Sequence, residues 1–514
     1  MLFNSFSFIL IFLPVVLLVW HGLNYIKKEK LADIFLVAAS LYFYGRFSKE
    51  FVVLLLISCC ITYIISSLII DLKKAYTSKL LMYFGIILNL GMLGYFKYTN
   101  FFMENIAAIT GKEFSALNIA LPIGISFYVF SQIAFLVDIY RENQEGHPLI
   151  KDGELLGKVS PIEYLLYITY FPKNIQGPIA LPYEMISQFR DKERRTLKAV
   201  NFRKGIQLFV IGLSKKVLLG DNLSKIADYG FKYTYYMDTI TGILVLISYA
   251  FQLYFDFSGY CDMAEGISLM LGIELPQNFN SPYKAYSVRN LWQRWHMTLT
   301  RFFVRYIYIP MGGSRKGKLR TALNILIIFV VSGFWHGAGW TYICWGLIMG
   351  ILVVFDNLGF IATEGDIKKN YLLRDKPLLV IPKVLGQALT FIAFLISLVF
   401  FRSQDMTYAF QMFKQFFFFT WPGFMYKTAE MLDISENYMV LQAAKLYAKG
   451  LVNYIYVGSW IVLLLISTVV MAKDNAREII EKEPKKGQIA LLVILFAWSF
   501  ISLSQVSTFI YFQF

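Results

Sequence analysis

The stretch that decides the fold of this chain runs from Asn278 to Trp345: NFNSPYKAYSVRNLWQRWHMTLTRFFVRYIYIPMGGSRKGKLRTALNILIIFVVSGFWHGAGWTYICW. Two of the four histidines of the chain lie in it, His296 and His336, and each directly follows a tryptophan. His336 ends an apolar run that begins at Thr321. Burying a titratable ring at the end of such a run is costly, so we expect either a functional site or a packed, hydrogen-bonded core residue.

The composition around this stretch is that of a membrane protein. Hydrophobic residues make up 57% of the chain and charged residues only 16%, against about 25% charged in soluble proteins. Many apolar runs approach the ~20 residues that a helix needs to cross a bilayer. The alternating pattern of a transmembrane β-barrel is absent from the sequence. The fold class that we predict is therefore an all-α, polytopic membrane protein.

The apolar runs predict about 11 or 12 transmembrane helices. Spans are expected at 6–25, 31–47, 51–70, 80–96, 206–220, 239–257, 321–336, 340–355, 384–401, 451–471 and 488–510. Proline, glycine and polar residues interrupt 121–140 and 161–180, which favours broken or re-entrant segments there. The polar stretch 287–309 is typical of one amphipathic helix at the membrane interface.

The net charge of +15 indicates cytoplasmic loops and not a surface for nucleic acid. Basic residues follow the first span and fill residues 190–204, so these loops are expected in the cytoplasm. The loop 190–204 could also attract an anionic ligand such as the phosphates of coenzyme A. From Arg320, a helix with a rise of ~1.5 Å per residue carries His336 about 24 Å inward, which places it within the membrane.

Three carboxylates, those of Asp256, Asp262 and Glu265, lie at the end of the predicted span 239–257. Acidic groups at membrane depth are functional candidates, although they could instead lie at the membrane edge and pair with arginines. No histidine or cysteine pair has the spacing of a metal site, so we predict no metal and no bound cofactor.

An isolated histidine in the membrane suits acid–base chemistry. Burial favours the neutral imidazole, which can take a proton from a hydroxyl. A hydroxyl activated in this way could attack a thioester. The glycine at position 337, directly after His336, would let an acyl thioester approach the ring closely.

Several longer motifs resemble the membrane-bound O-acyltransferase (MBOAT) superfamily, specifically its bacterial alginate O-acetyltransferase-like branch. They are LPIGISFYVFSQIAFLVDIY at 121–140, FPKNIQGPI at 171–179, GLSKKVLLGDNL at 212–223, YAFQLYFDFSGYCDMAEGISLMLGIELPQNFNSPY at 249–283, LWQRWHMTLTRFFVRYIYIPMGGSRKG at 291–317 and SGFWHGAGWTYICWG at 332–346. The segment VFFRSQDMTYAF and the closing FIYFQF are also similar to this branch. The resemblance covers nearly the whole chain.

The resemblance implies a helical membrane fold around a tunnel, with His336 as the catalytic histidine and His296 as the second histidine of the family. It also implies that acetyl-CoA from the cytoplasm is the acyl donor and that a separate extracytoplasmic transferase or polysaccharide-modifying protein is a partner. The location implied is the inner membrane of a bacterium, among membrane lipids. Candidates for lining the substrate and acyl channel are Trp292, Arg294, Trp295, Trp335, Gly337, Asp256 and Asp262.

The resemblance predicts a transmembrane core over residues 1–401, with the catalytic region at 278–345. Residues 402–514 are expected to form an extracytoplasmic amphipathic segment and the last transmembrane helices. Two alternatives stay open: D-alanyl transfer to teichoic acid, as in the shorter sister branch, and transport of a glycan or lipid without acyl transfer.

Overall fold

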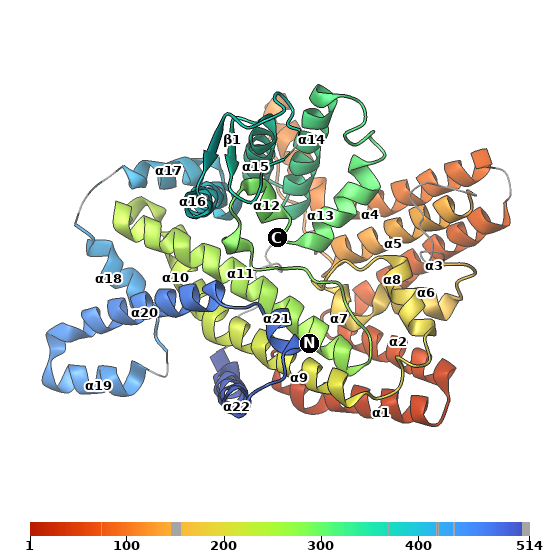
Figure 1. The fold of residues 1–514 in the computed structure, drawn as a ribbon, viewed down its shortest axis with the longest axis horizontal. Helices are drawn as coiled ribbons and strands as arrows, with labels where there is room; N and C mark the ends of the chain where they lie inside the picture. The colour runs from red at the N-terminus through yellow and green to blue at the C-terminus, as the bar shows by residue number, and fades with distance from the viewer. Residues whose placement is uncertain are drawn as a thin grey trace. The chain divides into compact units, whose positions relative to one another are not determined.

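The computed structural model describes residues 1–72, 75–144, 156–368, 370–417, 419, 421–434 and 437–505 (Figure 1). Two compact units share the chain. The first unit holds residues 1–210 and 260–277, and the second unit holds residues 211–259 and 278–514. Helix α11 (Thr239–Met270) contributes residues to both. The predicted boundary at residue 401 stays a prediction.

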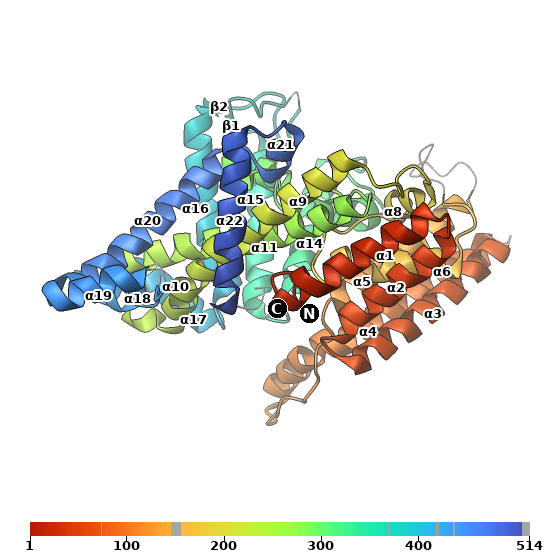
Figure 2. The same cartoon turned by 90° about the horizontal axis from the view of Figure 1, so that it is seen from below.

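The described secondary-structure elements of the first unit are all helices. Its long helices α3, α4 and α5 pack against one another, as the views in Figure 1 and Figure 2 agree. In chain order its elements are a π-helical turn at Phe8–Phe12, α1 (Leu13–Tyr25), α2 (Glu29–Gly45), α3 (Lys49–Asp71), α4 (Ala75–Thr110), α5 (Ile125–Glu142), α6 (Pro161–Thr169), α7 (Phe171–Asn174), α8 (Pro182–Arg190), most of α9 (Ala199–Ser214) and the end of α11.

The second unit holds the histidine stretch. Its helices include α10 (Asp221–Lys232), the first part of α11, α12 (Val288–Trp292), α13 (Met297–Phe303), α14 (Lys318–His336), α15 (Trp340–Leu358), α16 (Lys383–Arg402), α17 (Met406–Phe416), α18 (Gly423–Ala429), α19 (Tyr438–Tyr447), α20 (Val452–Ala472), α21 (Ala476–Glu481) and α22 (Lys486–Ile501). Short π or 3-10 turns cover 215–220, 234–236, 282–284, 304–308, 449–451 and 502–505. Strands β1 (Ile361–Thr363) and β2 (Leu379–Ile381) pair in parallel, which the sequence pattern did not predict.

The all-α, multi-pass membrane architecture is confirmed, with fewer long spans than expected. Among the described residues, 8 helices are long and apolar enough to cross a membrane: Phe8–Tyr25, α3, α4, α11, α14, α15, α16 and α20. Three other expected spans, 31–47, 206–220 and 488–510, correspond to shorter helices, α2 with 17 residues, α9 with 16 and α22 with 16. The end of the last expected span and the closing FIYFQF lie outside the described residues.

The break predicted within 121–140 lies near the start of that segment, because α5 is continuous from Ile125 to Glu142. The break lies before it, at Gly124, which has a φ of 72°. A Cβ on this glycine would lie 2.8 Å from the backbone oxygen of Asn174. The polar residues within the helix serve packing instead: the Gln132 amide oxygen accepts hydrogen bonds from Ser58 (3.1 Å) and Thr62 (2.6 Å) of α3.

The kink predicted within 161–180 is confirmed. Helix α6 ends at Thr169, and the four-residue α7 follows with Pro172 in its first turn. Lys173 of α7 is buried, and its ammonium donates to the Ser131 hydroxyl of α5 at 3.2 Å. It also lies 4.4 Å above the Tyr167 ring.

Helices α14 and α15 form a tight antiparallel hairpin because glycines lie where the two backbones meet. A Cβ on Gly333 of α14 would lie 2.2 Å from the backbone oxygen of Tyr342 in α15. A Cβ on Gly346 of α15 would lie 2.3 Å from the backbone oxygen of Phe329 in α14. Small residues at such contacts let membrane helices approach closely. The hairpin fixes the end of α14, where His336 lies.

Candidate functional site

His296 and His336, which are 40 positions apart in sequence, lie close together in the second unit. Their ring centroids are 6.5 Å apart. Both side chains are buried, with 1% of His296 and 4% of His336 exposed. The two histidines singled out in the sequence therefore belong to one site.

His296 lies in a break between two helices and not within a helix. The prediction of one amphipathic helix over 287–309 is wrong, because α12 ends at Trp292 and α13 begins at Met297. His296 lies between them with φ 44° and ψ 49°, a left-handed conformation that is rare for residues with a Cβ. Such strained residues persist where the surrounding structure holds them, and they gather at functional sites.

The segment 278–280 holds this break in place. The backbone N–H of Asn280 donates to the Arg294 carbonyl at 2.9 Å, and that of Met297 donates to the Asn278 carbonyl at 2.9 Å. These two bonds bracket His296 on both sides. Backbone hydrogen bonds to residues 278–280, which lie 16 to 18 positions earlier in the chain, therefore set the conformation of His296. Helix propensity does not set it.

The Asn278 side chain fixes the tautomer of His296. The side-chain oxygen of Asn278 accepts from the Thr298 backbone N–H (3.3 Å) and from the Thr298 hydroxyl (2.8 Å). A backbone N–H can only donate, so this atom is the amide oxygen. It lies 3.1 Å from Nδ1 of His296, which must therefore carry the proton. Burial lowers the pKa of His296 to about 3, so the ring is neutral at physiological pH.

Aromatic rings enclose both histidines. The ring centroid of His336 lies 4.8 Å from that of Trp335, 5.2 Å from that of Trp345 and 5.1 Å from that of Phe401 of α16. The His296 ring lies 4.8 Å from Phe257 of α11, edge to face. Enclosure of this kind excludes water and strengthens electrostatic interactions inside it.

The three predicted tryptophans differ in how directly they contact the histidine rings. Trp335 contacts both histidines, since its ring lies 6.2 Å from that of His296. Trp292 packs on Trp345, which in turn packs on His336. The ring centroids of Trp292 and Trp345 are 5.7 Å apart. The Trp295 ring centroid lies 5.3 Å from that of Phe394 and 5.1 Å from that of Phe279, whose ring lies 6.4 Å from that of His296.

Arg294 is engaged in holding the loop. Its Nε donates to the Asn290 side chain at 3.0 Å, and its guanidinium donates to the Asn280 carbonyl at 3.2 Å. Both partners belong to the segments that support the break at His296. A direct contact of Arg294 with a substrate stays a prediction.

The carboxylates are divided between the two units. Asp256 of the second unit is 3% exposed and binds Lys216, which also binds Asp221 at 2.6 Å. A buried lysine, Lys216, therefore balances the charge of Asp256, as burial of a charge requires. Asp262 and Glu265 belong to the first unit, and their roles stay predictions.

Gly337 follows the end of α14 and packs closely against Tyr342. A Cβ at this position would lie 2.1 Å from the Tyr342 ring. The glycine therefore makes room for this ring at the turn into α15. An approach of an acyl thioester at the same place stays a prediction.

A cavity of about 240 Å³ lies beside the enclosure. Its walls include Trp292, Phe329 and Ser332, which is one helical turn before His336 in α14. The lining is almost wholly apolar, with Arg289 and Gln293 among the few polar groups. Within the described part of the chain, no group of three or more His, Cys, Asp or Glu side chains could hold a metal ion. The arrangement offers proton transfer in a dry, apolar site.

Four residues of the site were missed in the sequence: Asn278, Phe257, Trp345 and Phe401. Asn278 begins the motif NFNSPY, but an asparagine in such a polar stretch does not predict which ring it contacts. Phe401 lies 65 positions after His336 and is one of 47 phenylalanines, so no local pattern distinguishes it. Their roles depend on tertiary packing.

Comparison with known proteins matches this region to one family. The model of the membrane-bound O-acyltransferase (MBOAT) family matches residues 61–363. A peptidoglycan O-acetyltransferase of Helicobacter pylori is 34% identical, over 100% of this chain and 98% of that protein. A probable alginate O-acetylase of Pseudomonas syringae is 33% identical, over 88% of this chain and 82% of that protein. A teichoic acid D-alanyltransferase of Bacillus subtilis is 27% identical over 47% of this chain and 60% of that protein.

Proposed function

Because the chain belongs to the membrane-bound O-acyltransferase family, and is therefore an acyltransferase, we propose that it acetylates a polysaccharide outside the cytoplasm with acetyl-CoA as donor. The acetyl group crosses the cell membrane, the inner membrane in a bacterium with two. A separate extracytoplasmic transferase or polysaccharide-modifying protein receives it. The names of the relatives that match most of the chain support acetyl transfer to a polysaccharide.

The observation that carries the proposal is the shared enclosure of His296 and His336, inside the residues that the family matches. A buried pair of histidines, walled by tryptophan and phenylalanine, is costly to keep unless it does chemistry. The enclosure also gives a transporter no evident advantage, because aromatic rings make up most of its walls.

His336 acts as the general base in the proposed step. Its imidazole takes the proton from the acceptor hydroxyl while the hydroxyl oxygen attacks the thioester carbonyl carbon. A carbon–oxygen bond forms, the carbon–sulfur bond breaks, and the proton passes to the leaving thiolate, which gives the ester and free coenzyme A. His336 is the last residue of α14, and the negative end of the helix dipole stabilises the imidazolium formed on the way.

His296 has a supporting role in this proposal. Asn278 holds its Nδ1 proton and burial keeps the ring neutral, so it does not supply a charge. Its ring packs against Trp335, and Trp335 packs against His336. This stack keeps the base in one orientation, which is what an efficient proton transfer needs.

The donor and the partner are assigned to opposite sides of the membrane. We assign the basic stretch 190–204 to the cytoplasmic side, where its positive charge supports binding of the phosphates of acetyl-CoA. The segment 402–450, with its short helices α17, α18 and α19, is the surface that we assign to the extracytoplasmic partner.

The test is chemical analysis of cell-surface polymers in a bacterium that carries this chain. The gene is deleted and then restored as wild type or as His336→Gln. Ester-linked acetate on peptidoglycan and on secreted polysaccharide, and D-alanine on teichoic acid, are measured by mass spectrometry. We expect acetate to fall on deletion and to return only with the wild type. A loss of D-alanine instead would support the sister activity. Unchanged acetate and D-alanine would contradict acyl transfer.

A further inference from the structure

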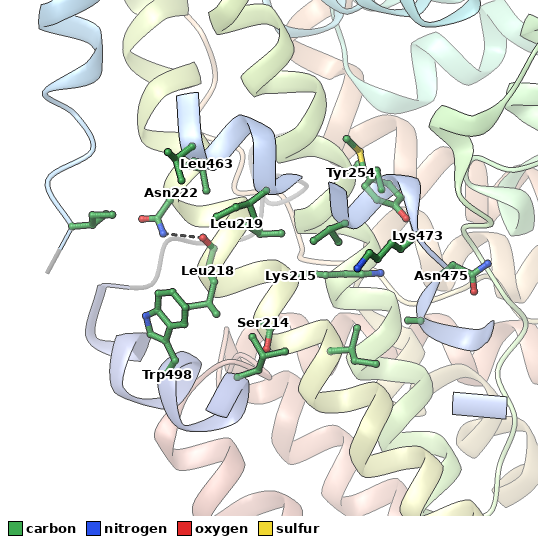
Figure 3. A pocket seen from close by; sticks show the side chains of 18 of the residues that line it. Ser214, Lys215, Leu218, Leu219, Asn222, Tyr254, Leu463, Lys473, Asn475 and Trp498 are labelled. Atoms are coloured by element: carbon green, nitrogen blue, oxygen red, sulfur yellow. Dashed lines mark hydrogen bonds between the residues drawn. The ribbon is translucent and has the colours of Figure 1, made fainter. Parts of the chain in front are cut away.

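A second and larger cavity, of about 590 Å³, lies in the second unit (Figure 3). Its walls come from residues 211–222 and from α20, α21 and α22. The last three helices lie beyond residue 363, where the match to the family model ends. This cavity shares no lining residue with the smaller cavity beside the histidines, and neither His296 nor His336 lines it.

The cavity follows one face of α20. The lining residues Ser459, Val462, Ile466 and Val470 recur every three or four positions. The lining extends from Gly458 to Lys473, which are fifteen positions apart, or roughly 22 Å along a helix. One leaflet of a bilayer has about 15 Å of hydrocarbon. Since α20 is a candidate membrane span, the cavity is long enough for an acyl chain of one leaflet.

One end of the cavity is positively charged. Lys473 follows directly after α20, and Lys215 and Tyr254 lie at the same end, away from Leu463 and Trp498 (Figure 3). The Lys215 ammonium lies 5.7 Å above the Tyr254 ring. A third lysine, Lys284, donates to the Lys473 carbonyl at 2.6 Å.

An acidic residue at this end of the cavity is held by another lysine. Asp474 also lines the cavity, but it pairs with Lys482 at 2.5 Å. A ligand therefore meets the lysines Lys215 and Lys473 at the end of the span and an apolar lining along α20. Basic pockets between membrane helices recognise anionic lipid head groups, and lysine suits a phosphate.

We propose that this cavity binds one anionic membrane phospholipid. Its phosphate lies between Lys215 and Lys473, and one acyl chain lies along α20 toward Gly458. The proposal is independent of the acyl transfer proposed above, and its readout is lipid binding, so either can fail without the other.

The test uses phosphatidylglycerol as the probe and phosphatidylcholine, which has no net charge, as the control lipid. The full-length protein is delipidated in detergent, each lipid is added, and bound lipid is counted by native mass spectrometry. We expect one phosphatidylglycerol to remain bound to the wild type at concentrations where phosphatidylcholine does not. Equal retention of both lipids would overturn the assignment of the head group.

Bulky substitutions locate the lipid. The double variant Val462→Trp, Ile466→Trp narrows the cavity, and the matched double variant Ile461→Trp, Leu465→Trp changes the same helix outside the lining. All four positions are exposed, at 54%, 48%, 44% and 59%, so neither variant disturbs the packed core. We expect the first to lower phosphatidylglycerol affinity at least tenfold and the second to leave it unchanged. Equal affinities would overturn the proposal.

Charge reversal tests the head group separately. Lys473→Glu should remove the preference for phosphatidylglycerol, whereas Lys486→Glu, at the first residue of α22 and outside the lining, should keep it. The end of the chain could be the occupant instead. If a variant that ends at residue 505 binds phosphatidylglycerol and the full chain does not, the proposal is overturned.

Discussion

Replacing Asn278 with leucine tests how His296 is held. The substitution keeps the size of the side chain and removes the oxygen that accepts from His296 Nδ1 and twice from Thr298. Asn278 is 0% exposed, so water cannot replace that oxygen. At about 1 kcal/mol for each of the stranded donors, the lower end of the usual range, the variant should lose about 3 kcal/mol of stability.

The same change should reduce catalysis, because the His296 ring is no longer fixed in one tautomer and orientation. We expect acetyl-CoA turnover to fall roughly 10- to 100-fold, the loss that a small misplacement in a site produces. Thermal unfolding in detergent measures the first effect. Nitrogen NMR of labelled histidine measures the tautomer, which a merely structural role would not change.

Thr298→Val is the matched control for this prediction. It removes one donor, the Thr298 hydroxyl, and leaves the bond between Asn278 and His296. Its cost should be about 1 kcal/mol, with turnover close to that of the wild type. If Asn278→Leu left both the NMR signature of His296 and turnover unchanged, the assignment of Asn278 as a positioning residue would be refuted.

Two further predictions concern buried charge. Lys216→Met leaves Asp221 and Asp256 buried without their lysine and should lower the free energy of unfolding by about 3–5 kcal/mol, as measured by thermal unfolding. Most of this stability should return when both aspartates are also replaced by asparagine. An unaltered melting temperature in the single variant would argue against the ion triad. Burial lowers the pKa of His296 to about 3 from 6.5, so the unfolded chain takes up a proton between these pH values and the folded chain does not. Stability should therefore fall by about 1.4 kcal/mol per pH unit below 6.5, and His296→Phe should flatten this dependence; equal slopes would show that His296 is not responsible.

The sequence predicted the parts of the site that depend on local pattern. The apolar run from Thr321 predicts α14 and places His336 at its end. The kink near Pro172 also follows from local chemistry, since proline cannot continue a helix.

Long-range packing decided the features that the sequence did not predict. The polar residues of 121–140 resemble a helix break, yet Gln132 is satisfied by Ser58 and Thr62 of a neighbouring helix, so α5 stays continuous. The stretch 287–309 has helical composition, yet two backbone bonds to the segment 278–280 hold His296 in a left-handed conformation. Neither partner is visible from the segment itself.

The central claim is that His336 is the base of an acyltransferase, and turnover of acetyl-CoA by purified, detergent-solubilised protein tests it most directly. The comparison is wild type against His336→Gln, with His21→Gln as the control, because His21 belongs to the first unit and binds the Met270 carbonyl. We predict that His336→Gln remains folded and loses at least about 100-fold in turnover, while His21→Gln retains it. Equal turnover in wild type and His336→Gln would contradict the account.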